Sequence, residues 1–434
     1  MFLRASMFFF SSCLLISSCS AASTLTVVHQ EHITSGGWLA GLTSLSGLSH
    51  EDLRRQAGTV LDLEGVENEP HKVPSLFHNK LVVPAYFDAR RRWPHCPSIG
   101  RIYEQGSCGA CWALAGAAVI SDRICIASKN QTLEIQISPQ DALICSGGVS
   151  NLCTGGYPKT PYVMYTGNGL VTGGPYLSRK GCMPYEAFTR VAADSTNSSN
   201  CIKSCSNSAS GKVYKLDKHY GSGWYAMGNR FSTNPGGAAE KLIRESVVKQ
   251  IQYELSTNGP LTVGIYFYKD FVNYKAGVYR HVTGERVGGH AMKLIGWGSE
   301  NKSDYWLLAN SWGTKWGSQG FVKFLRGENH LGIENYLVTA LPQLDKSPTA
   351  AAATQQTSIS CDASSAEFCA GKVGYAVHPP DVCTAEWCYC GGGSSTAPKV
   401  VSCPDGQSFD ADPSVYGCAD TDNVNACKTT NSAG

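Results

Sequence analysis

The chain has 434 residues, enough for a large hydrophobic core and for more than one domain. Its formal net charge is +2, which gives no electrostatic reason to expect binding to nucleic acid or to an anionic membrane surface. Charged residues make up only 16% of the chain whereas cysteine occurs 19 times, a composition typical of proteins from an oxidising compartment.

The first residues have the layout of a secretory signal peptide, which we place at residues 1–22. Arg4 precedes an apolar run over residues 7–16, and small residues follow as far as Ala22. The apolar run is too short for a membrane anchor, and no later segment is long and apolar enough to span a bilayer. A bacterial lipoprotein signal with Cys19 as the lipidated residue is the alternative interpretation. We expect a protein of the secretory pathway that has no membrane span.

Residues 23–82 form a polar segment that contains no cysteine. Within it, residues 48–55 predict a short helix, with Ser49 and Asp52 arranged like a capping box in which aspartate replaces the usual glutamate. A polar arm ahead of a cysteine-rich domain is either a disordered leader or a propeptide that lies across an active-site cleft. Because a candidate nucleophile follows at Cys111, we prefer the propeptide.

The central motif of the chain reads Gln-Gly-Ser-Cys-Gly-Ala-Cys-Trp at residues 105–112. It predicts a tight turn, and the apolar residues at helical spacing over residues 113–128 predict a buried helix that begins close to Cys111. A helix N-terminus carries partial positive charge, which favours the thiolate form of a cysteine. Gln105 lies just upstream, where its amide can donate a hydrogen bond to a developing oxyanion. These features are typical of half of an acyl-transfer site.

The later part of the same domain predicts strands rather than helices. Short apolar or alternating runs bounded by glycine occupy residues 261–267, 291–297, 305–309 and 320–324. They predict a barrel or a strongly twisted sheet. His290 follows two glycines on a predicted strand, and Asn310 lies at the end of another.

Residues 108–112 match the pattern C-G-[SA]-C-[WY], which surrounds the nucleophile of papain-family cysteine proteases. Over residues 83–342 the chain resembles the cathepsin B branch of this family. The matching segments are residues 84–96, 120–125, 155–158, 217–220, 274–279, 281–285 and 288–291. The resemblance implies an α+β, papain-like fold, in which a helical lobe and a β-barrel-like lobe enclose a cleft. It also implies a cysteine endopeptidase made as a zymogen, which acts on polypeptides, is inhibited by its own propeptide, and uses neither a cofactor nor a metal.

The resemblance assigns catalytic roles to Cys111, His290, Asn310 and Gln105. His290 would pair with the Cys111 thiolate and later protonate the leaving amine, and Asn310 would orient the imidazole. Trp312 would shield the bond between Asn310 and His290 from water. Gln105 and the backbone N–H of Cys111 would hold the oxyanion. The alternative function is a catalytically silent relative that binds matrix or carbohydrate, although such relatives usually lose the nucleophile, which is intact here.

Two further groups of residues are expected to bind substrate. Gly155 and Gly156 would expose backbone groups that pair with an extended peptide. The S2 pocket, which accepts the side chain two residues before the scissile bond (P2), would involve Pro158, Gly289, Ala291 and Tyr336. Tyr336 stands where cathepsin B has a carboxylate at the base of this pocket. We therefore expect a preference for apolar or aromatic P2 side chains over arginine.

Residues 184–200 depart from the cathepsin B pattern. In this interval cathepsin B carries an occluding loop, with two adjacent histidines that bind the C-terminal carboxylate of a substrate. The interval here is shorter and contains no histidine. We therefore expect mainly endopeptidase action rather than removal of dipeptides from a C-terminus. Arg190 could bind a carboxylate instead, although a solvated surface arginine is the commoner case.

The cysteines of the same domain number nine, so at least one is unpaired. The resemblance implies four disulfides, which join Cys96 to Cys125, Cys108 to Cys153, Cys145 to Cys201 and Cys182 to Cys205. Cys111 is then the cysteine left free, and two of the six disulfides of cathepsin B are missing. Asn130, Asn197 and Asn301 begin sequons for N-glycosylation.

The C-terminal part of the chain predicts a linker and a second unit. Residues 343–360 are small and polar, as in a flexible linker. Residues 361–430 contain eight cysteines, and six of them follow a spacing similar to that of peritrophin-type chitin-binding modules. Trp387, Tyr389 and Phe409 could stack on the sugar rings of chitin or another polysaccharide, or they could form a small core in a structural cap. A lysosomal, vacuolar or extracellular destination fits the whole pattern.

Overall fold

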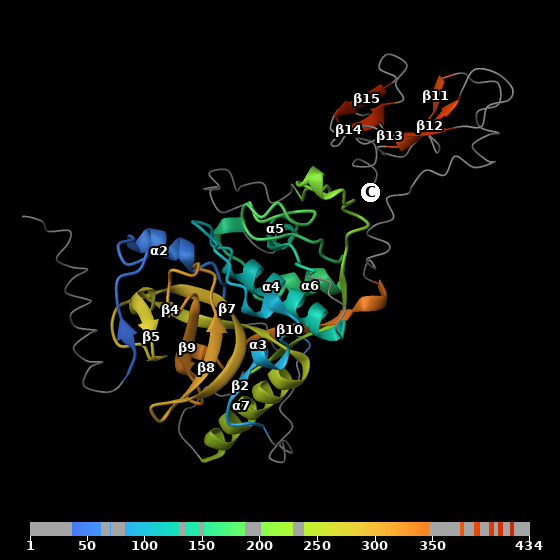
Figure 1. Cartoon of the computed structure of the whole chain (residues 1–434). Helices are drawn as coiled ribbons and strands as arrows, with labels where there is room; N and C mark the ends of the chain where they lie inside the picture. Colours follow the sequence, from blue (N-terminus) through green and yellow to red (C-terminus); the bar gives the residue numbers. More distant parts are fainter. Residues whose placement is uncertain are drawn as a thin grey trace, which may run out of the picture.

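The computed structural model describes residues 37–61, 70, 83–129, 135–146, 152–186, 201–228 and 238–346, together with five short strands between residues 374 and 420 (Figure 1). The predicted signal peptide and the sequons at Asn130 and Asn197 lie outside the described residues, as do most of the predicted linker and of residues 184–200. Within the described part of the chain, no helix combines the length and the apolar character that a membrane span requires.

The first lobe is helical and is built around α4 (Cys111–Ala127), which begins at the expected residue. α5 (Pro139–Ile144) and α6 (Thr160–Thr166) pack beside it (Figure 1). Side chains on every face of α4 are buried, because α5 and α6 cover one side and strands of the second lobe cover the other. Gly116 allows the close approach of α6, since a Cβ atom at this position would lie 2.6 Å from Cγ of Pro161.

The second lobe is an eight-stranded sheet with the pairing order β3-β10-β4-β7-β8-β9-β6, in which β2 also pairs with β7. Its strands are β2 (Phe87–Asp88), β3 (Tyr220–Met227), β4 (Leu261–Tyr268), β6 (Val278–Tyr279), β7 (Arg286–Glu300), β8 (Ser303–Ala309), β9 (Phe321–Leu325) and β10 (Leu337–Gln343). Neighbouring strands are antiparallel except for β6 and β9. The predicted strands over residues 261–267, 291–297, 305–309 and 320–324 correspond to β4, β7, β8 and β9. The long α7 (Ala238–Asn258) packs against β7 (Figure 1).

Two adjacent charged residues in the middle of α4 join the lobes through buried ion pairs. Asp122 Oδ2 accepts a hydrogen bond of 2.8 Å from Nζ of Lys293 on β7. Arg123 donates to Oε1 of Glu254 on α7 over 3.1 Å, and both side chains of this pair are 1% exposed. Burial raises the pKa of Asp122 and lowers that of Lys293. Breaking a buried pair leaves an uncompensated charge, so these contacts fix how α4 lies on the second lobe.

The N-terminal segment lies against the second lobe. β1 (Leu39–Ala40) pairs with β5 (Tyr274–Ala276), and Trp38 is buried beside the Tyr274 and Tyr279 rings. The indole of Trp38 also donates a hydrogen bond of 2.8 Å to the carbonyl of Arg280. This segment is therefore anchored by main-chain pairing and by aromatic burial.

α2 (His50–Gln56) follows, and it is the helix that the capping pattern predicts. The Ser49 hydroxyl accepts a hydrogen bond of 3.1 Å from the backbone N–H of Asp52 and donates one of 2.7 Å to its carboxylate. The side chain of Leu53, which is 1% exposed, packs α2 against the core of the second lobe. His50 pairs with Glu285 over 2.9 Å.

The remaining elements are short. They are α3 (Ala89–Arg92) and the 3₁₀ turns Pro97–Gly100, Leu152–Thr154, Ser208–Ser210, Lys269–Asn273, His330–Gly332 and Leu344–Lys346. The predicted linker overlaps the last elements of the second lobe, since Gln343 pairs with Tyr220 at the end of β10. The polar composition after residue 342 did not reveal this pairing, because main-chain hydrogen bonds do not depend on side-chain type.

The C-terminal strands form two small antiparallel sheets. β11 (Gly374–Ala376), β12 (Glu386–Cys390) and β13 (Lys399–Ser402) make the first, and β14 (Gln407–Asp410) and β15 (Gly417–Asp420) make the second. The cysteine spacing predicts a disulfide-rich unit here, without strand positions.

Candidate active site

The predicted nucleophile lies where the two lobes meet. Cys111 is the first residue of α4, and the side chain is fully buried. Of the cysteines whose side chains the structure describes, it is the free one. His290 is carried by β7, and Asn310 directly follows β8, so strand pairing in the second lobe brings these two residues together. The packing of α4 on β7 then brings both of them to Cys111.

Several groups act on the thiol of Cys111. Burial raises its pKa, but the positive charge of His290 opposes this effect. Hydrogen bonding with His290, with Thr59 and with the backbone N–H of Ala291 also lowers the pKa. The net result is a pKa below the usual value, which increases the thiolate population at a given pH. This is the electrostatic condition for a cysteine nucleophile.

The His290 ring is held from two sides. Its Nε2 lies 2.7 Å from Oδ1 of Asn310, and the Trp312 ring packs against it with 4.6 Å between ring centroids. Asn310 and Trp312 are 3% and 4% exposed, so the bond between His290 and Asn310 is shielded from water. The other ring nitrogen of His290, Nδ1, lies 3.1 Å from the carbonyl oxygen of Gln56. The contacts of His290 with Asn310 and Trp312 are those that the resemblance implies.

Gln105 is fully buried, and its side chain is oriented by a neighbour that the sequence interpretation did not include. The Ser311 hydroxyl donates a hydrogen bond of 2.7 Å to Oε1 of Gln105. The amide nitrogen is thereby turned toward the carbonyl oxygens of Cys108, at 2.9 Å, and Gln56, at 3.4 Å. The only available signal for Ser311 was its position between Asn310 and Trp312.

Residues 56–61, which follow α2, run through the site. Thr59 Oγ1 lies 3.0 Å from Sγ of Cys111. Gly58 pairs in parallel with Gly289, and Thr59 pairs in parallel with Gly156. The carbonyl of Gln56 meets both Gln105 Nε2 and His290 Nδ1, the two groups expected to handle a substrate carbonyl and a leaving group.

The glycines expected to bind substrate pair with this segment. Gly156 donates to the carbonyl of Gly58 over 2.9 Å and accepts from the N–H of Val60 over 3.0 Å. Gly155 has a φ of +137°, which favours glycine, and a Cβ atom there would lie 3.2 Å from the same carbonyl. A Cβ atom at Gly58 would lie only 1.8 Å from the carbonyl oxygen of Gly109, so the main chains approach closely on both sides.

Leu61 occupies the region expected to be the S2 pocket. Its side chain packs on the Cα positions of Gly264 and Gly289, where an added Cβ atom would lie 2.5 Å and 3.0 Å from Leu61 carbons. The backbone N–H of Gly264 in turn donates to the carbonyl of Tyr336 over 3.3 Å. Tyr336 and Ala291 belong to the same buried cluster as Cys111.

The last member of this expected set is Pro158, which is buried. Its place in the S2 pocket stays an expectation.

Four disulfides are present in the peptidase region, and they join the pairs that the resemblance implies. They are Cys96–Cys125, Cys108–Cys153, Cys145–Cys201 and Cys182–Cys205. Among the described residues, one group, His95 with Cys96 and Cys125, has the spacing of metal ligands. The two sulfur atoms are bonded to each other, so neither is available as a thiolate ligand.

Comparison with known proteins gives consistent matches over this region. A model of papain family cysteine proteases matches residues 83–341. Cathepsin B-like cysteine proteinase 5 of Caenorhabditis elegans is 39% identical over 292 residues, which cover 63% of this chain and 80% of that protein. Cathepsin B-like cysteine proteinase 4 of the same species is 38% identical over 277 residues, covering 61% and 77% respectively.

A solved structure of a proenzyme also matches. The procathepsin B called S9 from Trypanosoma congolense aligns with a TM-score of 0.59 and 28% identity, over 74% of this chain and 98% of that chain. The match to the family model covers more than half of the chain, and the aligned solved structure is that of a proform. The chain therefore belongs to the papain family of cysteine proteases and is a cathepsin B-like member of it.

Proposed function

We propose that the chain is a cysteine endopeptidase that cleaves peptide bonds through Cys111, His290 and Asn310. The observation that carries this proposal is the position of His290. One ring nitrogen is fixed by Asn310, and the charge of the ring lowers the pKa of the Cys111 thiol against the effect of burial. A thiol in this state is a nucleophile, and the adjacent imidazolium is a proton donor for the leaving group.

The reaction follows from these positions. The Cys111 thiolate forms a bond to the carbonyl carbon of the substrate, and the resulting oxyanion is held by Gln105 Nε2 and the backbone N–H of Cys111. The carbon–nitrogen bond then breaks, and the leaving amine takes the proton of His290. Next, His290 removes a proton from water, which attacks the thioester. The product leaves as a carboxylic acid, and the thiolate and imidazolium are restored.

Residues 37–61 act in this proposal as the inhibitory part of a propeptide. They fill the backbone sites of Gly156 and Gly289, and they present the Thr59 hydroxyl rather than a scissile carbonyl to the thiol. The carbonyl oxygen of Gln56 lies within hydrogen-bond distance of both Gln105 Nε2 and His290 Nδ1. Removal of this segment would expose the site. We propose that the propeptide ends near residue 82, because the amino-acid composition changes there.

The proposed activity is tested by hydrolysis of fluorogenic dipeptidyl substrates after acid activation, with and without an epoxysuccinyl thiol-protease inhibitor. We expect turnover of a Phe-Arg substrate that the inhibitor abolishes, and no turnover by Cys111→Ala. If the matured and correctly bridged protein turns over neither a dipeptidyl substrate nor a protein, and Cys111 is not labelled, the catalytically silent alternative is correct.

Tyr336 leads to a prediction about specificity. The presence of Leu61 against Gly264 and Gly289 supports an apolar S2 pocket. Tyr336→Glu should therefore raise the ratio of Arg-Arg to Phe-Arg cleavage by at least about tenfold, because an arginine side chain gains a charged hydrogen-bond partner. The ratio of kcat/KM values for the two substrates measures this change. Tyr336→Phe is the matched control and should leave the ratio within about twofold; an unchanged ratio in Tyr336→Glu would remove Tyr336 from the pocket.

We also propose that the C-terminal unit binds carbohydrate and that the protein enters the secretory pathway. The spacing of six cysteines over residues 361–430 supports the first proposal, and the apolar run before Ala22 supports the second. Asn301 lies exposed in the turn between β7 and β8, as a glycosylated asparagine requires. Retention of the intact chain on chitin beads, and its loss after truncation at residue 346, tests the carbohydrate proposal.

A further inference from the structure

Residues 182–186 form a short strap beside the active site, within the helical lobe. Its main chain is held by hydrogen bonds to neighbouring segments. The N–H groups of Met183 and Tyr185 donate to the carbonyls of Thr172 and Gly174, each over 2.9 Å. The Ser138 hydroxyl donates to the carbonyl of Met183 over 2.5 Å. These contacts fix the path of the strap independently of the catalytic residues.

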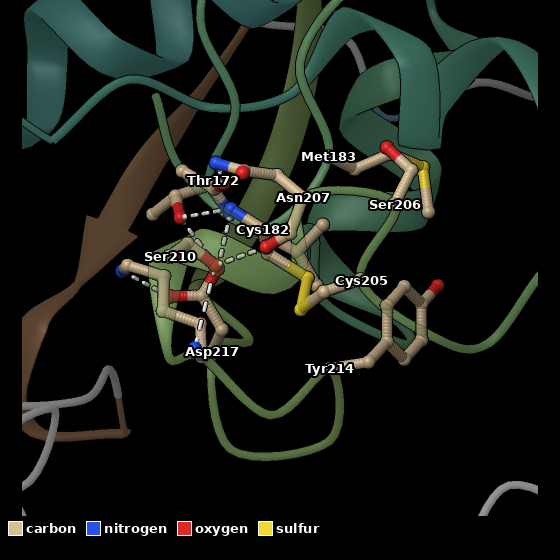
Figure 2. The surroundings of a disulfide bond; sticks show 12 residues. Thr172, Cys182, Met183, Cys205, Ser206, Asn207, Ser210, Tyr214 and Asp217 are labelled. Atoms are coloured by element: carbon tan, nitrogen blue, oxygen red, sulfur yellow. Dashed lines mark hydrogen bonds and ion pairs between the residues drawn. A yellow bond between two sulfur atoms is a disulfide. The ribbon is translucent and has the colours of Figure 1, made fainter. Parts of the chain in front are cut away.

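A disulfide fixes the beginning of the strap. Cys182 is fully buried and is bonded to Cys205, and its N–H donates to the Thr172 hydroxyl over 3.2 Å (Figure 2). The carbonyl of Cys182 also accepts a hydrogen bond of 3.1 Å from the N–H of Asn207. Tyr185 lies three residues further along, so the position of its ring is set by a cross-linked main chain.

The hydroxyl of Tyr185 reaches the oxyanion residue. It donates a hydrogen bond of 2.9 Å to the backbone carbonyl of Gln105, and the two residues are 1% and 0% exposed. Burial, together with the charge of Cys111, raises the pKa of Tyr185 above its ordinary value. The hydroxyl therefore keeps its proton and stays a donor throughout the working pH range of an enzyme.

Gln105 is thus held from both lobes. On the strand lobe, Ser311 accepts from the backbone N–H of Gln105 over 2.8 Å and donates to its side-chain oxygen. On the helical lobe, the Tyr185 hydroxyl bonds the backbone carbonyl. A shift of this backbone by a few tenths of an ångström would move the amide nitrogen that faces the oxyanion, and hydrogen bonds depend steeply on distance and angle.

We propose that Tyr185 is a positioning residue for the oxyanion hole, which acts by fixing the main chain of Gln105 from the disulfide-anchored strap. This inference rests on the proposed peptidase function, because the oxyanion arises only in that reaction. Tyr185 itself touches neither the substrate nor the reacting atoms. Its contribution should therefore appear in the step in which charge develops on the substrate oxygen, and not in the binding of the substrate.

The test is Tyr185→Phe, which removes one oxygen atom and keeps the ring. Rates are expressed per active site, counted by titration with the epoxysuccinyl inhibitor, so that a fraction of misfolded protein does not affect them. We expect kcat to fall about three- to tenfold with KM changed by less than about twofold, the range for one neutral hydrogen bond. The inhibition constant of a peptide aldehyde, whose adduct with the thiol carries an oxygen in the same position, should rise by a similar factor.

Two comparisons separate positioning from a general loss of structure. Alkylation of Cys111 by iodoacetamide forms no oxyanion, so its rate should be unchanged in Tyr185→Phe. Tyr162→Phe is the matched control, because Tyr162 is also fully buried and its hydroxyl lies 2.7 Å from that of Thr262, away from Gln105. It should change neither kcat nor aldehyde inhibition.

Three results would overturn the proposal. The first is wild-type kcat and aldehyde inhibition in Tyr185→Phe. The second is an equal loss in Tyr162→Phe, and the third is a parallel loss of the alkylation rate in Tyr185→Phe. Failure of the proposed function itself is a different result, namely absence of inhibitor-sensitive turnover in the wild-type enzyme.

Discussion

Replacing His290 with alanine should lower kcat/KM of the matured enzyme by more than about 10³-fold, since it removes both the partner of the thiolate and the proton donor. The substitution should also change how the thiolate population of Cys111 depends on pH. His290 opposes the effect of burial and holds the pKa of the thiol below its usual value. The thiolate is present above that pKa and is lost as the pH falls through it. Without His290 the effect of burial remains, so the thiolate should appear only at higher pH.

The measurement is the rate of alkylation of Cys111 by iodoacetamide as a function of pH, after removal of the propeptide. The wild-type enzyme should react at lower pH than His290→Ala, and the pH profile of the variant should be shifted to higher pH. His95→Ala is the control, because this histidine is exposed and lies beside the Cys96–Cys125 disulfide. An unchanged pH profile of alkylation in a folded His290→Ala protein would show that another group sets the pKa of Cys111.

Replacing Gly58 with valine should convert the latent proenzyme into one with an accessible active site. A Cβ atom at this position would lie 1.8 Å from the carbonyl oxygen and 2.2 Å from the carbonyl carbon of Gly109. Both are main-chain atoms beside Cys111, so the mature domain cannot yield and the propeptide must move away. Gly58 also accepts a hydrogen bond from the N–H of Gly156, which this movement would break.

Labelling of Cys111 by an epoxysuccinyl reagent at neutral pH measures the exposure of the site before any processing occurs. The labelling rate of the Gly58→Val proenzyme should exceed that of the wild type by at least about tenfold, since a loss of roughly 1.4 kcal/mol in propeptide binding already has this effect. Gly47→Ala is the matched control, because nothing lies within 4 Å of a Cβ atom at that position. Equal labelling of the wild-type and Gly58→Val proenzymes, with the chain uncleaved on a gel, would mean that residues 56–61 do not block the thiol.

Features with a local cause could be predicted from the sequence. The cap of α2 depends on Ser49 and Asp52, which are three residues apart, and the start of α4 depends on the turn at residues 105–110. The strands of the second lobe appeared as apolar runs because each is buried over a length of a few residues. Resemblance to a family added the catalytic set and the disulfide pairs, which no spacing in a single sequence can determine.

Other features depend on contacts between distant segments, and only the tertiary structure determined them. Ser311 and Tyr185 are ordinary residues in the sequence, yet they hold Gln105 from opposite lobes because the packing of α4 on β7 brings the lobes together. Gln343 is the last residue of β10, and it pairs with Tyr220 on β3, a strand more than a hundred residues earlier in the chain. The sequence therefore determined which chemistry this protein can perform, and long-range packing determined which residues hold its groups in place, since hydrogen bonds between remote segments leave no local pattern.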